Sequence, residues 1–137
     1  MTAAPTLEPL ARLVLWLLAG YHLLFGAAAL LAPTVAARLV RSAYGAQIPD
    51  GGAFRYMTSM IGALALAIGG LACVAALAPA QHRAIVAALL GLQLCRIFCR
   101  VRDRTLLGAS LGVSPRRNGA AVLVLGAECA VLALWLR

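Results

Sequence analysis

The stretch YMTSMIGALALAIGGLACVAAL, residues 56–77, contains no charged side chain and is long enough to cross a membrane as one helix. A helix needs roughly 20 apolar residues to span the hydrocarbon core of a bilayer. Gly62, Gly69 and Gly70 lie among its alanines, and small residues let helices approach one another closely in lipid. Pro79 ends the run. We therefore predict a transmembrane helix at the centre of a helix bundle.

Three further apolar runs flank this stretch, at about residues 10–32, 84–99 and 119–136. Pro33 ends the first of them. This first run is longer than the roughly 7–15 apolar residues of a cleaved signal peptide, and its leader carries Glu8 as well as Arg12. We expect it to be retained as a helix, so that the chain has four spans.

The composition of the whole chain agrees with a membrane protein. Hydrophobic residues make up 64% of the 137 residues, and the mean hydropathy is +0.95. A soluble domain of this size buries only about 60–70% of the surface of its unfolded chain, too little to hide so much apolar area. The sequence therefore predicts a single domain, residues 1–137, of the all-α class: an integral membrane four-helix bundle.

Residues 33–54 differ from the spans because apolar and charged residues alternate there. Arg38 and Arg41 interrupt an apolar series, and the turn-rich sequence IPDGG follows at residues 48–52. Helices with one apolar and one basic face lie in the membrane interface. We expect a short interfacial amphipathic helix after the first span and then a loop. A second long loop is expected at residues 105–118.

The placement of the arginines predicts the orientation of the spans. Eight arginines flank the two long loops and three flank the opposite side of the membrane. The loop group is Arg38, Arg41, Arg55, Arg100, Arg102, Arg104, Arg116 and Arg117, and the opposite group is Arg12, Arg83 and Arg137. Because cytoplasmic loops carry an excess of positive charge, we expect a multi-pass protein of the inner (cytoplasmic) membrane with both termini outside and both long loops in the cytoplasm.

The formal net charge of +8 is concentrated in loops between apolar runs. It does not form the basic face of a soluble domain that binds nucleic acid, so we expect no nucleic-acid partner. We expect contact with the lipid bilayer and with anionic lipid headgroups instead. The four cysteines lie in apolar segments without a C-x-x-C pair, and no metal site is predicted.

Glu128 lies near the middle of the fourth run, where a charged side chain costs roughly 2.5–3.5 kcal/mol on insertion scales. Arg96 differs from it in depth by about 6–8 Å at the rise of a helix, a gap that an arginine side chain spans. We predict a buried pair that fixes how the third and fourth spans dock. Two alternatives stay open: a proton-coupled or substrate-binding role for Glu128, and a contact with a partner subunit.

His22, near the middle of the first span, is conceivable as a ligand of haem or chlorophyll, since imidazole is a common metal ligand. The other histidine, His82, lies in the loop on the opposite side, so two axial histidines within one chain are not expected. The aromatic residues Trp16, Tyr21, Tyr44, Tyr56 and Trp135 are too scattered along the chain to predict a ligand site. We predict no cofactor and leave contact with a quinone or pigment open.

Arg96, Arg100 and Asp103 share a helical face at i, i+4 and i+7. Arg55, at the start of the second span, could join them. Such a group can bind an anionic headgroup, a quinone oxygen or a phosphate. The alternative, which we favour, is that these side chains are interface anchors with local ion pairs.

The order of these features resembles the DoxX-like group of small four-helix bacterial membrane proteins. The resemblance rests on Gly26 followed by Pro33, on Phe54-Arg55-Tyr56 at the start of a glycine-rich span, on Arg96 and Asp103 at the end of the third span, and on Glu128 in the fourth. It implies membrane subunits or accessory proteins, some associated with quinone-linked oxidation. It also implies a shared polar core of Arg55, Arg96, Asp103 and Glu128.

The sequence as a whole favours a small accessory or structural subunit that packs within a larger membrane protein complex or self-associates. The small-residue faces suit close helix packing, and few polar groups are present to carry out chemistry. An enzymatic role is therefore less favoured than a non-catalytic one. The alternative is a small proton-coupled transporter or quinone-interacting enzyme that uses Glu128 with Arg96 and Arg55.

Overall fold

The computed structural model describes residues 7–47 and 51–137, and these residues form only helices and their connections. The helices are α1 (Glu8–Leu31), α2 (Pro33–Tyr44), α3 (Gly52–Leu77), α4 (Arg83–Arg102), α5 (Arg104–Leu111) and α6 (Pro115–Leu136). Four of them, α1, α3, α4 and α6, are long and apolar enough to cross a membrane. The predicted all-α fold with four spans is confirmed, and the length and composition of its helices are those of a multi-pass membrane protein.

The helices extend beyond the apolar runs that predicted them. α3 begins at Gly52, α4 continues to Arg102, and α6 begins at Pro115. Arginine side chains permit this extension because their charged ends reach water while their stems cover apolar surface. The prediction of a loop at residues 105–118 was wrong in part, because α5 occupies its first half. α5 ends at Gly112, whose φ of +67° is a conformation that glycine adopts without steric cost.

α1 and α3 form the most closely packed pair. A Cβ atom on Gly62 of α3 would lie 2.7 Å from the Leu30 nitrogen and 2.9 Å from the Gly26 oxygen of α1. The two backbones therefore touch where both helices carry glycine, as expected for helices in lipid. The opposite face of α3, with Leu64 and Leu71, is exposed. α3 thus lies beside α1 and not at the centre of the bundle, because only one of its faces is packed against another helix.

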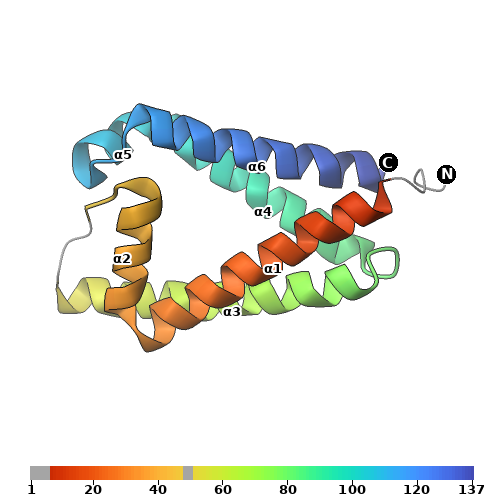
Figure 1. Cartoon of the computed structure of the whole chain (residues 1–137), viewed down its shortest axis with the longest axis horizontal. Helices are drawn as coiled ribbons and strands as arrows, with labels where there is room; N and C mark the ends of the chain where they lie inside the picture. The colour runs from red at the N-terminus through yellow and green to blue at the C-terminus, as the bar shows by residue number, and fades with distance from the viewer. Residues whose placement is uncertain (1–6, 48–50) are drawn as a thin grey trace.

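The second pair consists of α4 and α6. Figure 1 shows that the two pairs converge where α1 begins and α6 ends, and separate toward the opposite end. The main buried core lies at the converging end. Its members come from all four spans and include Leu15, Leu18, Ala72, Ala75, Val86, Leu89, Leu132 and Trp135. The packing of the bundle is therefore tight at one end and open at the other.

α2 crosses the open end between the two pairs (Figure 1). It presents a buried Ala36 and an exposed Arg38 on different sides, as expected for the amphipathic helix predicted here. Gly45 ends α2 with a φ of +70°. The backbone N–H of Gln47 then donates to the Leu111 carbonyl oxygen at 2.7 Å and attaches this segment to α5. α2 therefore forms one wall of the space between the pairs.

Candidate binding cleft

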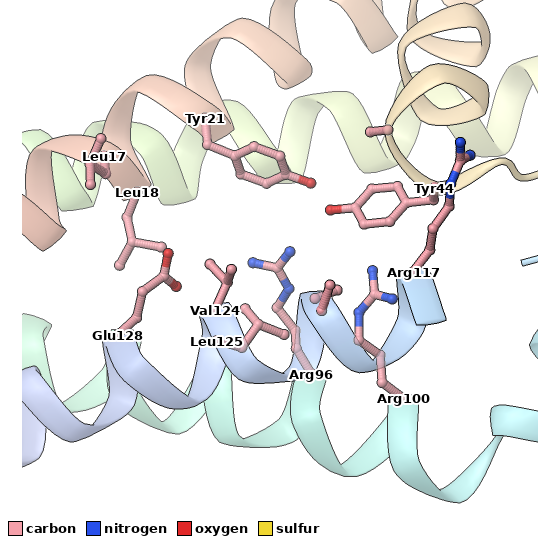
Figure 2. A pocket seen from close by; sticks show the side chains of 13 residues that line it. Leu17, Leu18, Tyr21, Tyr44, Arg96, Arg100, Arg117, Val124, Leu125 and Glu128 are labelled. Atoms are coloured by element: carbon pink, nitrogen blue, oxygen red, sulfur yellow. The ribbon is translucent and has the colours of Figure 1, made fainter. Parts of the chain in front are cut away.

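A cavity of about 330 Å³ lies in this space between α1, α2, α4 and α6. Apolar side chains and alanines form most of its wall. Its polar lining consists of Tyr21, Tyr44, Arg96, Arg100, Arg117 and Glu128 (Figure 2). We call this cavity the arginine cleft. It is within the roughly 300–1,000 Å³ of typical small-molecule sites, which are likewise mostly apolar with a few placed polar groups.

Arg96 and Arg100 project from successive turns of α4, and each guanidinium lies over a tyrosine ring. The Arg96 Cζ atom is 5.5 Å from the centroid of the Tyr21 ring, and the Arg100 Cζ atom is 4.8 Å from that of Tyr44. Such contacts hold a guanidinium by its flat face and leave the N–H groups at its edge as donors. Figure 2 shows the two phenol oxygens directed toward one another across the cleft.

Arg100 is also held by a residue of α6, and Arg117 packs against the end of α2. Arg100 Nη1 donates to Asn118 Oδ1 at 3.1 Å, and Asn118 Nδ2 donates to the Arg100 carbonyl oxygen at 3.1 Å. Arg117 lies against Gly45, where a Cβ atom would come within 2.5 Å of Arg117 Nη1. The lack of a side chain at Gly45 thus permits both the turn after α2 and the close approach of Arg117. Within the described ranges, none of the cleft arginines forms an ion pair with a carboxylate.

Glu128 and Arg96 do not form the direct pair that the sequence suggested, because Gln93 lies between them. Gln93 Nε2 donates to Glu128 Oε2, and Arg96 Nη1 donates to Gln93 Oε1 at 2.8 Å. Gln93 is 1% exposed, whereas Glu128 and Arg96 are half-buried, so only the middle of this chain of hydrogen bonds is fully buried. The carboxylate and the guanidinium are linked through one amide, and both also line the cleft.

The other predicted site residues are distributed around the cleft. His22 is buried on α1 and its Nδ1 donates to the Leu18 carbonyl oxygen at 2.8 Å, a satisfied position within the bundle. Asp103 lines a neighbouring cavity of about 410 Å³ that shares Arg96 and Arg100 with the cleft. Arg55 is exposed in the first turn of α3 and is not in the lining of either cavity.

Asp103 forms an ion pair with its neighbour in sequence, Arg102. Arg102 Nε and Nη2 donate to its two carboxylate oxygens at 2.8 and 2.7 Å. These hydrogen bonds lower the pKa of Asp103 below its ordinary value, so the carboxylate stays charged. Asp103 and Arg102 therefore compensate one another at the mouth of the second cavity, and the charge of Arg100 is left to the cleft.

The sequence did not predict five of the residues at this site, namely Gln93, Arg117, Asn118 and the two tyrosines, Tyr21 and Tyr44. Gln93 carried a signal, since it is an uncharged amide inside an apolar run, three residues before Arg96. The tyrosines are 23 positions apart, on helices joined through Ala32, and the sequence places them together only after the path of α2 is known. Among the described residues, no group of three or more His, Cys, Asp or Glu side chains could hold a metal ion.

The charges of the cleft determine which ligands fit it. Three arginines and one glutamate line the same space, and the carboxylate of Glu128 already accepts from Gln93. Charges withdrawn from water are stabilised by an opposite charge with hydrogen bonds. An anionic group with several acceptor oxygens supplies both.

No family model, no curated protein and no solved structure matches this chain, so the resemblance to the DoxX-like group stays a prediction based on the residues quoted above.

Proposed function

We propose that this chain is a small, non-catalytic membrane protein that binds the anionic head group of a lipid-like amphiphile in the arginine cleft. The observation that carries the proposal is the presence of Arg96, Arg100 and Arg117 in the lining of one cavity, without a carboxylate paired to any of them in the described chain. Guanidinium groups bind phosphate and carboxylate through several parallel N–H donors.

The apolar part of the cleft favours an amphiphile as the ligand rather than a small free anion. Leu17, Leu18, Val124 and Leu125 line the cleft beside the polar groups. These side chains lie on α1 and α6, in the spans themselves. A head group held by the arginines can therefore extend its tail along apolar surface. Because such a tail already lies in lipid, this apolar surface accommodates it without a hydrophobic gain, and the affinity comes from the head group.

The proposed setting of this protein is the inner membrane, with both termini outside. The arginines support this orientation through the excess of positive charge on cytoplasmic loops. The cleft lies toward the open end, which α2 crosses and where the arginine-rich segments gather. In this orientation the cleft faces the cytoplasmic leaflet, whose anionic lipids are attracted to basic segments.

Native mass spectrometry in a neutral detergent tests the proposal with a matched pair of variants, Arg117→Gln and Arg116→Gln. Arg117 lines the cleft and Arg116 does not, although the two are adjacent and both exposed. We expect phosphatidylglycerol to bind more tightly than phosphatidylcholine. Loss of a hydrogen bond to a charged group costs about 1.5–3 kcal/mol, so Arg117→Gln should weaken binding about tenfold or more and Arg116→Gln should leave it unchanged.

The same experiment separates a lipid from a free anion. Binding of inorganic phosphate with no preference for phosphatidylglycerol would identify a water-soluble ligand. Equal retention of phosphatidylcholine and phosphatidylglycerol, or equal losses in both variants, would contradict the proposal. Titration with salt is a further check, because exposed charge contacts weaken as ionic strength rises while buried contacts are screened less.

A second candidate function is the accessory subunit expected from the sequence. The observation that favours it is a set of small exposed residues at helical spacing on the outer side of α4, namely Ala84, Ala88 and Gly91. A partner helix can approach closely along such a face. Purification from the native membrane in a mild detergent tests it. A stoichiometric membrane partner, lost when Gly91 is replaced by leucine, would support this candidate.

A further inference from the structure

The hydrogen-bonded chain of Glu128, Gln93 and Arg96 connects a carboxylate to one of the arginines that we assign to ligand binding. Both ends of the chain line the arginine cleft, and the middle residue is buried. Gln93 accepts from Arg96 at 2.8 Å and donates to Glu128. The negative charge of Glu128 is therefore the nearest compensation that the described residues supply for the positive charge of Arg96.

The other charged and titratable groups around Glu128 do not supply an alternative to it. From α4 only Arg96 approaches it, and from α1 the nearby groups are Tyr21, on which Arg96 lies, and His22, which is bonded to Leu18. On α6, Cys129 is the next residue in sequence. Arg100 and Arg117 line the same cleft and add positive charge. Glu128 is thus the one acid among several cations at this place in the described structure.

An anionic ligand and the ionised Glu128 carboxylate both compensate the charge of Arg96, the ligand by direct contact and Glu128 through Gln93. With Glu128 charged, Arg96 is partly compensated and the ligand must share it. With Glu128 protonated, Arg96 keeps its positive charge, but the negative charge of Glu128 is gone. The ligand then becomes the counter-ion of Arg96. Because charges are costly inside a membrane, the second state favours the anion more strongly.

Resting on the proposed function, we infer that the arginine cleft takes up a proton on Glu128 together with its anionic ligand. The proton adds to a carboxylate oxygen of Glu128, no covalent bond of the ligand breaks, and the net charge of the cleft changes little on binding. Linkage makes this coupling reciprocal: a lower pH tightens ligand binding, and the ligand favours the protonated acid.

The test uses decanesulfonate, an amphiphile whose head group keeps one negative charge throughout the pH range. The full chain is placed in nanodiscs of phosphatidylcholine, and binding is measured by isothermal titration calorimetry with empty nanodiscs subtracted. Between about pH 8, where a glutamate of ordinary pKa is charged, and about pH 4, where it is mostly protonated, we expect the affinity to rise by about 5-fold to 150-fold, as is usual for coupled sites.

Two variants identify the group that takes up the proton. Glu128→Gln carries a permanently neutral side chain, and we expect it to bind decanesulfonate at high pH as tightly as the unaltered protein does at low pH, with no dependence on pH. Any contribution from His22 would persist in this variant. Glu8→Gln is the control, because Glu8 pairs with Arg12 at 3.0 Å at the start of α1, outside the cleft. It should behave as the unaltered chain does.

A measurement on the unaltered chain keeps the inference testable if Glu128→Gln does not fold. Titrations in two buffers with different ionisation enthalpies report the number of protons taken up, and we expect net uptake on binding. Binding that is independent of pH and takes up no proton would overturn the inference and leave the proposed function intact. Absence of binding at every pH would instead contradict the proposed function.

Discussion

Gln93 is placed where one side chain must satisfy two opposite charges. Its amide has a donor end and an acceptor end, and the structure uses the first for Glu128 and the second for Arg96. Leucine at this position could satisfy neither partner, and glutamate could accept from Arg96 but would place a second carboxylate against Glu128. The neutral amide is therefore the residue type that lets an acid and a base share the interior of the bundle without direct contact.

Gln93→Leu should lower the free energy of unfolding by about 1–3 kcal/mol, the cost of leaving a buried polar group without its partner. Steric trapping in neutral bicelles measures this quantity reversibly. Gln81→Leu is the matched control, since Gln81 is exposed in the connection between α3 and α4. We expect no comparable loss there. Equal effects of the two changes would mean that the hydrogen bonds of Gln93 contribute little to stability.

The cleft residues differ in how far the sequence could predict them. Glu128 and Arg96 could be found because charges inside apolar runs are rare and costly. Their connection through Gln93 could not, because a depth difference along the membrane does not fix the rotation of either helix. The place of Arg117 depends on the turn at Gly45, and the place of Tyr44 depends on the direction that α2 takes after Ala32. That direction is set by contacts distant in sequence.

The pairing of α1 with α3 shows how glycines determine the geometry of two helices. Gly62 meets the backbone of α1 near Leu30 and Gly26, whereas Gly70 on the same helix has no atom within 4 Å of the position of a Cβ atom. The sequence predicted close approach from both glycines equally. Periodicity alone does not show which small residues face a partner, and the assignment of α3 to the bundle centre failed for this reason.

Gly62→Ala should therefore lower the stability, and Gly70→Ala should not. The methyl group at position 62 would lie within 3.0 Å of α1 backbone atoms, and such overpacking costs about 1–3 kcal/mol. The methyl group at position 70 meets open space, and alanine favours a helix by up to about 1 kcal/mol over glycine. Thermal unfolding in dodecyl maltoside, followed by circular dichroism, should show a lower midpoint for the first variant and an unchanged or higher one for the second. A lower midpoint for Gly70→Ala would instead indicate a packed face on that side of α3.

The whole molecule combines a packed end with an open end, and these ends were predictable to different degrees. Four apolar runs required four spans, which the structure contains. The apolar residues did not indicate that the pairs separate, since a lipid-filled gap and a protein-filled gap need the same apolar side chains. Only the arginines marked the open end, because they gather in the segments that flank it. The cleft is thus a property of how the helix pairs are joined.

Orientation is the property of the whole molecule that the arginines predict most directly. Eight of them flank the long connections and three flank the opposite side, so we expect the C-terminus to lie outside the cytoplasm. Alkaline phosphatase fused after Arg137 should be active, and green fluorescent protein fused there should be dark. A fusion after Arg104, in the second long connection, should give the reverse pattern. Fluorescence from the fusion after Arg137 would mean that the open end of the bundle, with its cleft, faces away from the cytoplasm and receives its ligand from the outer leaflet.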